Sequence, residues 1–381
     1  MKKPQSKPRS IFEEVGAEGP APVAAAPARR REPERRAIAV WLSILFALVV
    51  VMIGVGGATR LSDAGLSITE WKPVTGALPP SDEATWEAEF ARYREIPQYQ
   101  ALNPTMTLPE FKAIYWWEWG HRQLGRAIGL VWAAGFLWFL ARRRIPAGWT
   151  GRLLGLGVLG GLQGAIGWWM VASGLAPEMV SVAPTRLAIH LGLAFAILGL
   201  IAWYVMSLRR EEADLLQARR QRSPGLIAWG SVLTGVAFVQ ILLGALVAGL
   251  DAGRTYAEWP MMGGGIVPPD GFELTPAWRN FVENPGLVQF DHRMVGYLLA
   301  VLGLVAWARS RKSGLVHVRR AFDAMAIMIL AQMALGIVTV INAAPLHMAL
   351  THQLGAVATF TLILHARFAA LYPKAQKIAR G

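Results

Sequence analysis

The sequence predicts an all-α integral membrane protein in which eight transmembrane helices form two tandem four-helix bundles, related by a pseudo-two-fold axis along the membrane normal. Only 17% of the 381 residues are charged, whereas a soluble domain carries about a quarter. Eight continuous apolar stretches are each long enough to cross ~30 Å of hydrocarbon as a helix. They do not alternate apolar with polar residues, which argues against barrel strands. The motifs of the first half recur in the second.

Basic clusters between the spans predict the orientation of the chain. RRREPERR (29–36), RRR (142–144) and RSRK (309–312) all fall on one side of the eight-span order. This positive-inside pattern is the one expected of a protein in the bacterial inner membrane with both termini in the cytoplasm. The net charge of +13 is therefore a signal of topology, and no nucleic-acid partner is expected. The predicted spans are 37–57, 115–140, 153–172, 186–207, 226–249, 288–308, 322–341 and 348–371.

The segment before the first span differs in composition from the rest. Residues 1–36 are rich in Pro, Ala and Arg, which predicts a disordered cytoplasmic tail. They contain no apolar core of the kind found in a cleaved secretory signal. Cysteine is absent from the whole chain, so a metal or cofactor must be bound by His, Met, Tyr or carboxylate.

The chain repeats itself with an offset of about 170 residues. His121-Arg122 matches His292-Arg293, and GGATRLSDAG (56–65) matches GALVAGLDAG (244–253). An even number of spans separates equivalent segments, so the two halves have the same orientation in the membrane. We therefore divide the chain into an N-terminal half and a C-terminal half, each with one long outer loop. The halves cover 37–222 and 223–381, their outer loops cover 58–112 and 250–286, and a short surface helix with Ser81 as its N-cap is expected at 81–96.

Four histidines occupy equivalent places near the outer ends of the even-numbered spans: His121, His190, His292 and His352. For a single histidine, a hydrogen bond to backbone or lipid headgroups is an adequate explanation. Ionisable residues within spans are rare and usually functional, however, and here they form a two-fold set. Two imidazoles on parallel helices, without cysteine or a carboxylate cluster, are typical of axial haem ligation. The sequence thus predicts two haem-sized pockets, one in each half, and a structural role for the other three histidines (His317, His347 and His365).

Glutamine and glycine recur four residues apart in the odd-numbered spans. The pairs are Gln163/Gly167, Gln240/Gly244 and Gln332/Gly336, with Met52/Gly56 as an altered fourth copy. Such a small-residue surface allows either close helix packing or the approach of a flat macrocycle. Four arginines near the outer boundary are candidates for binding haem propionates, with contacts to lipid headgroups as the alternative. They are Arg122, Arg186, Arg254 and Arg293.

These motifs resemble those of the haem A synthase family. The resemblance rests on ExxHR (118–122), NPGLVQFDHRMVGY (284–297), GGATRLSDAGLSITEWKPVTGALPP (56–80) and GLDAGRTYAEWPMMGGGIVPP (249–269). It extends over residues 38–370 and includes loops that membrane packing alone does not dictate. The absence of cysteine is similar to the alphaproteobacterial and mitochondrial form of the family. Other members have a cysteine pair in the first outer loop, so a thiol-based role cannot apply to this chain.

The resemblance implies an enzyme that oxidises the C8 methyl group of haem O to the formyl group of haem A, which terminal oxidases require. It implies His121 and His190 as iron-facing ligands of the substrate, and His292 and His352 as ligands of an electron-relaying haem b. It also implies contact with haem O synthase (protohaem farnesyltransferase), with cytochrome oxidase assembly factors and with an electron carrier. Membrane lipid surrounds the protein, and self-association as a homo-oligomer is left open.

Glu118 breaks the repeat, because Gln289 stands at the equivalent place in the second half. A carboxylate three residues before His121 lies on the same helix face and could act as a base or stabilise positive charge. The alternative is that Glu118 is exposed at the membrane edge and pairs with Arg122. Two rival functions are a di-haem b electron-transfer protein or quinol oxidoreductase, and a transporter built from parallel repeats.

Overall fold

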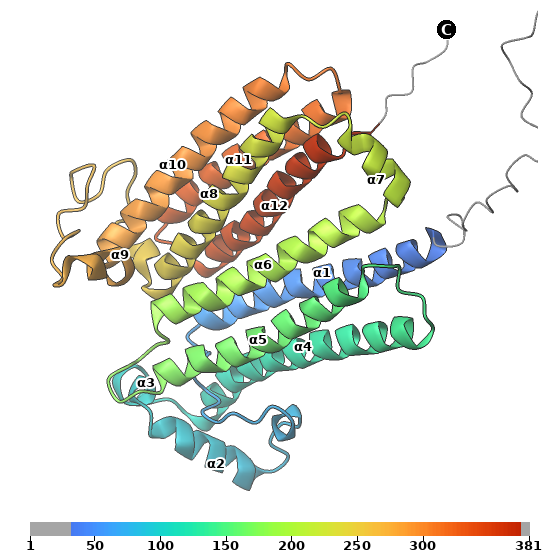
Figure 1. Cartoon of the computed structure of the whole chain (residues 1–381). Helices are drawn as coiled ribbons and strands as arrows, with labels where there is room; N and C mark the ends of the chain where they lie inside the picture. The colour runs from blue at the N-terminus through green and yellow to red at the C-terminus, as the bar shows by residue number, and fades with distance from the viewer. Residues whose placement is uncertain (1–31, 375–381) are drawn as a thin grey trace, which may run out of the picture.

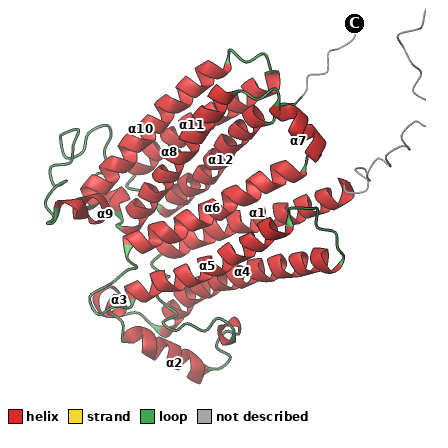
Figure 2. Cartoon of the chain, in the orientation of Figure 1, coloured by secondary structure: helices red, strands yellow, loops and turns green. Residues whose placement is uncertain are grey.

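The computed structural model describes residues 32–374, which form helices and loops without a β-strand (Figures 1 and 2). Eight of these helices are long and apolar enough to cross a membrane, and each contains one predicted span. The all-α membrane class and the eight spans are therefore confirmed. The helices are α1 (Glu32–Leu61), α4 (Leu108–Ala141), α5 (Thr150–Gly174), α6 (Pro184–Leu208), α8 (Pro224–Gly249), α10 (Pro285–Ser310), α11 (Val316–Ile341) and α12 (Leu346–Leu371).

Several helices begin earlier than the apolar pattern indicated, because their first turns are polar or capped. Thr107 and Glu110 form a capping box that starts α4, seven residues before the predicted position 115. Proline occupies the first turn of α6, α8 and α10, where its missing N–H costs no hydrogen bond. A hydropathy window does not detect such turns, which explains the shift.

The helices pack as two groups of four that share one apolar core. Helices α1, α4, α5 and α6 contact one another in a ring, and α8, α10, α11 and α12 do the same. The groups meet where α6 packs on α8 and where α12 packs on α1 and α6. Half of the most apolar 18-residue stretch of α6 and of α12 is buried, but only 6% of that of α5, so α5 lies at the periphery. The two-fold relation between the groups stays a prediction.

One end of the helical layer holds the first turn of α1, the end of α12 and the short helix α7 (Glu212–Arg219), which the sequence did not predict (Figure 1). Arg35 donates hydrogen bonds to the carbonyls of Ser207 and Arg210, and Arg210 in turn donates to Tyr372. Residues 32–36 therefore belong to α1, which corrects the predicted tail at that boundary. The rest of the tail, 1–31, lies outside the described residues.

The opposite end carries two caps of unequal construction (Figure 1). The first, between α1 and α4, contains α2 (Glu83–Arg94) and α3 (Pro97–Leu102) and has its own core of buried aromatic and aliphatic side chains. Asp82, instead of the predicted Ser81, caps α2 by accepting a hydrogen bond from the Thr85 N–H. The second cap, between α8 and α10, contains only the short helix α9 (Asn280–Glu283) and two single turns of 3-10 helix.

Candidate functional site

Each of the four repeat-equivalent histidines lies against a glycine of a neighbouring helix. A Cβ atom added to any of these glycines would come closer to the imidazole than ordinary van der Waals contact allows. The pairs, with the distance from that Cβ to the nearest ring atom, are Gly56–His121 (3.2 Å), Gly167–His190 (2.9 Å), Gly244–His292 (3.1 Å) and Gly336–His352 (2.8 Å). The glycines of the odd-numbered spans therefore provide the space that each imidazole occupies.

His292 and His352 form the better-defined pair. Their ring centroids are 6.3 Å apart, with ring planes at 83°. Two imidazoles that bind one iron from opposite sides through bonds of about 2 Å have centroids about 6–6.5 Å apart. The His292 Nδ1 atom is buried without a hydrogen-bond partner. The geometry of this pair therefore suits axial ligation.

A cavity of about 270 Å³ surrounds the His292–His352 pair, and its lining is mainly apolar. Its polar lining includes Gln240, Gln332 and Arg254. Among residues 32–374, no cluster of three or more His, Asp or Glu side chains could hold a bare metal ion. A planar macrocycle that supplies the remaining iron ligands fits this donor set, because the protein contributes only two nitrogens.

His121 of α4 and His190 of α6 are the corresponding pair in the first half. They lie close enough for their charges to interact, between Gly56 of α1 and Gly167 of α5. All four helices of the first half thus contribute to the surroundings of these two imidazoles. The predicted pairing of histidines within each half agrees with this arrangement.

Glu118 does not lie exposed at the membrane edge, since only 2% of its surface is accessible. One carboxylate oxygen accepts hydrogen bonds from the Ser67 hydroxyl (2.7 Å) and the Ile68 N–H (2.9 Å). The other accepts two from Arg122, at 3.2 and 2.6 Å. Both oxygens are therefore committed to the first cap and to the arginine one turn along α4.

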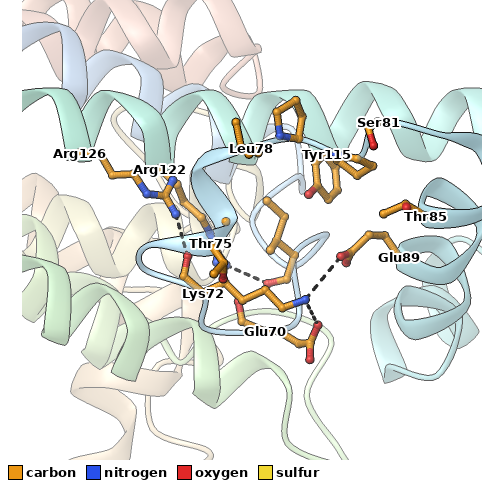
Figure 3. Close-up of a pocket in the computed structure, with 14 residues that line it drawn as sticks. Glu70, Lys72, Thr75, Leu78, Ser81, Thr85, Glu89, Tyr115, Arg122 and Arg126 are labelled. Atoms are coloured by element: carbon orange, nitrogen blue, oxygen red, sulfur yellow. Dashed lines mark hydrogen bonds and ion pairs between the residues drawn. The ribbon is translucent and has the colours of Figure 1, made fainter.

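Arg122 completes this connection between the cap and α4. Its guanidinium also donates to the carbonyls of Ile68 (2.8 Å) and Glu70 (3.1 Å). A pocket of about 260 Å³ opens beside it, between α4 and the cap, lined by charged residues that include Lys72 and Arg126 (Figure 3). Arg126 donates to the carbonyls of Lys72 and Pro73, so this part of α4 holds the cap mainly through backbone oxygens.

The second half repeats the same connection without a carboxylate. Arg293 donates to the carbonyls of Tyr256 (2.9 Å) and Met261 (3.3 Å), and Gln289 donates to the same Tyr256 carbonyl (3.1 Å). Tyr256 aligns with Ile68 in the repeat. Glu118 and Gln289, each three residues before a histidine, thus both hold an outer cap, and only the first half does so with a carboxylate.

Comparison with known proteins identifies the family. Residues 39–364 match the family described as cytochrome oxidase assembly protein. The chain is 62% identical over 377 residues to heme A synthase from Dinoroseobacter shibae, with 98% of each chain covered. It is 58% identical over 386 residues to heme A synthase from Cereibacter sphaeroides, covering 98% of this chain and 99% of the relative. The heme A synthase of Paracoccus denitrificans is 62% identical over 339 residues, 89% of each chain.

The chain belongs to the haem A synthase family. The resemblance expected from the motifs is confirmed, and with it the class of oxidoreductase enzymes to which the family belongs. The match extends through both caps and all eight spans.

Two arginines and three histidines that the sequence analysis of this haem A synthase family member considered remain to be placed. Arg186 donates to the Trp169 carbonyl and lies over the Trp169 ring. Arg254 lines the cavity of the second half, and its guanidinium has no partner within residues 32–374. His347 and His365 are exposed, and His317 accepts a hydrogen bond from the Lys374 N–H.

Two contacts between the halves were not predicted from the sequence. Gln353, next to His352, donates to the Ile53 carbonyl (2.8 Å) and lies against Gly57, next to Gly56. Arg60 binds both Asp63 (3.1 Å) and Asp251 (3.0 Å), the aspartates that the repeat aligns. The sequence did contain a signal for the second contact: Arg60 has no counterpart in the second half, where Ala248 stands at the equivalent position.

Proposed function

We propose that this protein is a haem A synthase, which oxidises the C8 methyl group of haem O to the formyl group of haem A for cytochrome oxidase. The observation that supports it most strongly is the combination of two histidine pairs, each held against glycines, with near full-length similarity to proteins named heme A synthase. The overall change from CH3 to CHO adds one oxygen atom and removes four electrons from the methyl carbon, and these electrons pass to an acceptor that is not part of the chain. Two successive hydroxylations give a geminal diol, which loses water to form the aldehyde.

The two halves are proposed to have different occupants. His121 and His190 would hold the substrate haem O, and His292 and His352 would hold a resident haem b. Bound haem b supplies one-electron transfer, and the chain's own residues set its place and access. The 6.3 Å separation of the His292 and His352 rings supports the second assignment, and the proximity of His121 to His190 supports the first.

Glu118 is proposed to act in catalysis mainly by its charge and by its position. Every hydrogen bond that it accepts comes from the cap or from Arg122, so a base role would require one of these bonds to break. A fixed negative charge one turn from His121 can instead stabilise positive charge that develops on the substrate. It also fixes the first cap to α4 through Ser67 and Ile68.

The arginines near each pair are proposed to meet the haem carboxylates. Arg254 is the strongest candidate, because its guanidinium lines the second cavity and has no other partner among the described residues. Arg293 lines the same cavity while donating to cap carbonyls. Arg122 holds the corresponding position beside the first pair. A bound propionate would add an ionic hydrogen bond to these contacts.

The proposed setting is the bacterial inner membrane, with both termini in the cytoplasm and both haem sites near the periplasmic side. Two observations support this orientation: the basic loops, and the position of the start of α1 and the end of α12 at the same end of the molecule (Figure 1). The partners proposed are haem O synthase, an electron carrier and assembly factors of cytochrome oxidase.

The test is co-expression of the protein with a source of haem O, followed by extraction and chromatography of its haems. We expect haem b together with haem O or haem A. His292→Ala should lose haem b selectively, because one of its two protein ligands is gone. Two haem b per chain and no haem O or A would support the di-haem electron-transfer alternative, and a colourless protein would support the transporter.

A further inference from the structure

Three of the four imidazoles are contacted by a glutamine amide that comes from the neighbouring helix. Each amide nitrogen donates to the backbone carbonyl of its histidine: Gln163 to His190 (3.0 Å), Gln240 to His292 (2.9 Å) and Gln332 to His352 (2.7 Å). The same nitrogens lie 3.2–3.3 Å from the nearest nitrogen of the imidazole rings. Each glutamine amide thus contacts both the ring and the backbone carbonyl of its histidine.

The amide oxygens of the same three glutamines share a second property. All three Oε1 atoms are buried and have no hydrogen-bond partner. An imidazole that binds a metal through one nitrogen keeps a proton on the other, and an acceptor for that N–H fixes the orientation of the ring. The amide nitrogen now faces the ring, so a half-turn of the amide would bring the unpaired oxygen to the N–H of a metal-bound imidazole, in exchange for the bond to the histidine carbonyl. Each of the three glutamines can therefore hold its histidine, through the backbone carbonyl or through the ring.

His121 is the exception, because Met52 stands where the glutamine would be. The structure places the Met52 side chain as it places Gln240. An added Cβ on Gly125 would lie 3.5 Å from the Met52 Cε, and one on the equivalent Gly296 would lie 3.2 Å from the Gln240 Nε2. A thioether donates no hydrogen bond and is a weak acceptor. Within residues 32–374, the carbonyl and ring of His121 therefore have no amide contact.

We propose that Met52 makes His121 the exchangeable iron ligand of the first pocket, whereas Gln163, Gln240 and Gln332 hold the other three imidazoles in place. The substrate haem then stays attached through His190 while the His121 side opens for a small ligand or for release of the product. This inference rests on the proposed function, since it requires iron between each pair. Met52 is a positioning residue here, because it acts through His121.

The test uses full-length protein purified with its haems, reduced, and titrated with carbon monoxide, while extraction gives the amounts of haem b and of haem O plus haem A. In the wild type, carbon monoxide binding should match the haem O plus haem A content and leave haem b unreactive. Met52→Gln should lower the carbon monoxide affinity about tenfold, the lower end of typical effects of residues that orient metal ligands. Gln240→Met, the matched reverse change, should make haem b reactive.

A second pair of variants identifies the histidine that exchanges. His121→Gly should keep the substrate haem bound and reactive with carbon monoxide, and His190→Gly should lose that haem. Carbon monoxide affinity that is unchanged in both Met52→Gln and Gln240→Met, with both haems retained, would overturn the proposal. So would loss of the substrate haem in His121→Gly but not in His190→Gly. These outcomes leave the proposed function intact, whereas extraction of haem b alone would refute that function first.

Discussion

Replacing Glu118 separates the two contributions that the structure assigns to this side chain, its charge and its attachment of the first cap. Glu118→Ala removes four accepted hydrogen bonds at once. Glu118→Gln keeps an oxygen for Ser67 and Ile68 but removes the charge. The second half shows that glutamine is compatible with this task, since Gln289 binds the equivalent cap through the Tyr256 carbonyl.

The expected magnitudes follow from the burial of the ion pair. The side chains of Glu118 and Arg122 are 3% and 20% exposed, and breaking a buried pair by removing one partner costs about 3–5 kcal/mol. Arg122 retains two carbonyl acceptors in the Ala variant, so we expect a loss near the lower end, about 3 kcal/mol. Glu118→Gln loses the ionic part of the pair and should cost about 1–2 kcal/mol.

Two measurements on the same preparations distinguish the contributions. Limited proteolysis reports whether the cap is released, and chromatography of extracted haems reports haem O, the alcohol intermediate and haem A. We expect Glu118→Ala to release the cap and to stop at haem O or the alcohol. We expect Glu118→Gln to keep the cap folded and still to form little haem A. Normal haem A from a Gln variant with an intact cap would refute the role of the charge and leave Glu118 as a structural residue.

Two further predictions concern the second half. Gly244→Ala should reduce the haem b content, because the new methyl group would lie 3.1 Å from the His292 ring. Gly235→Ala in the same helix meets nothing within 4 Å and should leave haem b unchanged. Pigment extraction compares the two variants, and equal haem content would contradict the close packing of glycine on imidazole. The hydrogen bond to Asp270 raises the pKa of Tyr256 from 10.0 to about 12, so the neutral phenol stabilises the second cap fully below pH 10.0 and loses this contribution as the pH rises towards 12. The melting temperature of the wild type should therefore exceed that of Tyr256→Phe below this window and approach it within the window, and a difference independent of pH would exclude the Tyr256–Asp270 bond as the cause.

The spans and the four histidines could be predicted because they depend on local pattern. Twenty apolar residues in a row have few alternatives to a transmembrane helix, and the repeat distinguishes His121 from His347 without knowledge of any contact. The repeat also placed Gly56, Gly167, Gly244 and Gly336 in one class. Each of these glycines packs against an imidazole of a neighbouring helix, and such a contact between helices cannot be predicted from the spacing of residues within one helix.

The contacts of the outer caps could not be predicted, because they depend on the path of an irregular chain. Arg122 and Arg293 were candidates for haem carboxylates, and the structure shows their guanidinium groups on cap carbonyls. Asp82 caps α2 instead of Ser81 because its carboxylate reaches the Thr85 N–H, and either residue has a suitable side chain. Arg60 and Asp251 are 191 positions apart, so no local pattern relates them.

The pairing of each imidazole with a glycine of another helix has a consequence for the order in which the two sites can assemble. The first pair is complete once α1, α4, α5 and α6 are in the membrane, all of which precede residue 209. The second pair needs α12 as well, because His352 lies on it, and α12 follows the other seven spans in the chain. Since chains are synthesised from the N-terminus, the helices of the first site are all available before those of the second.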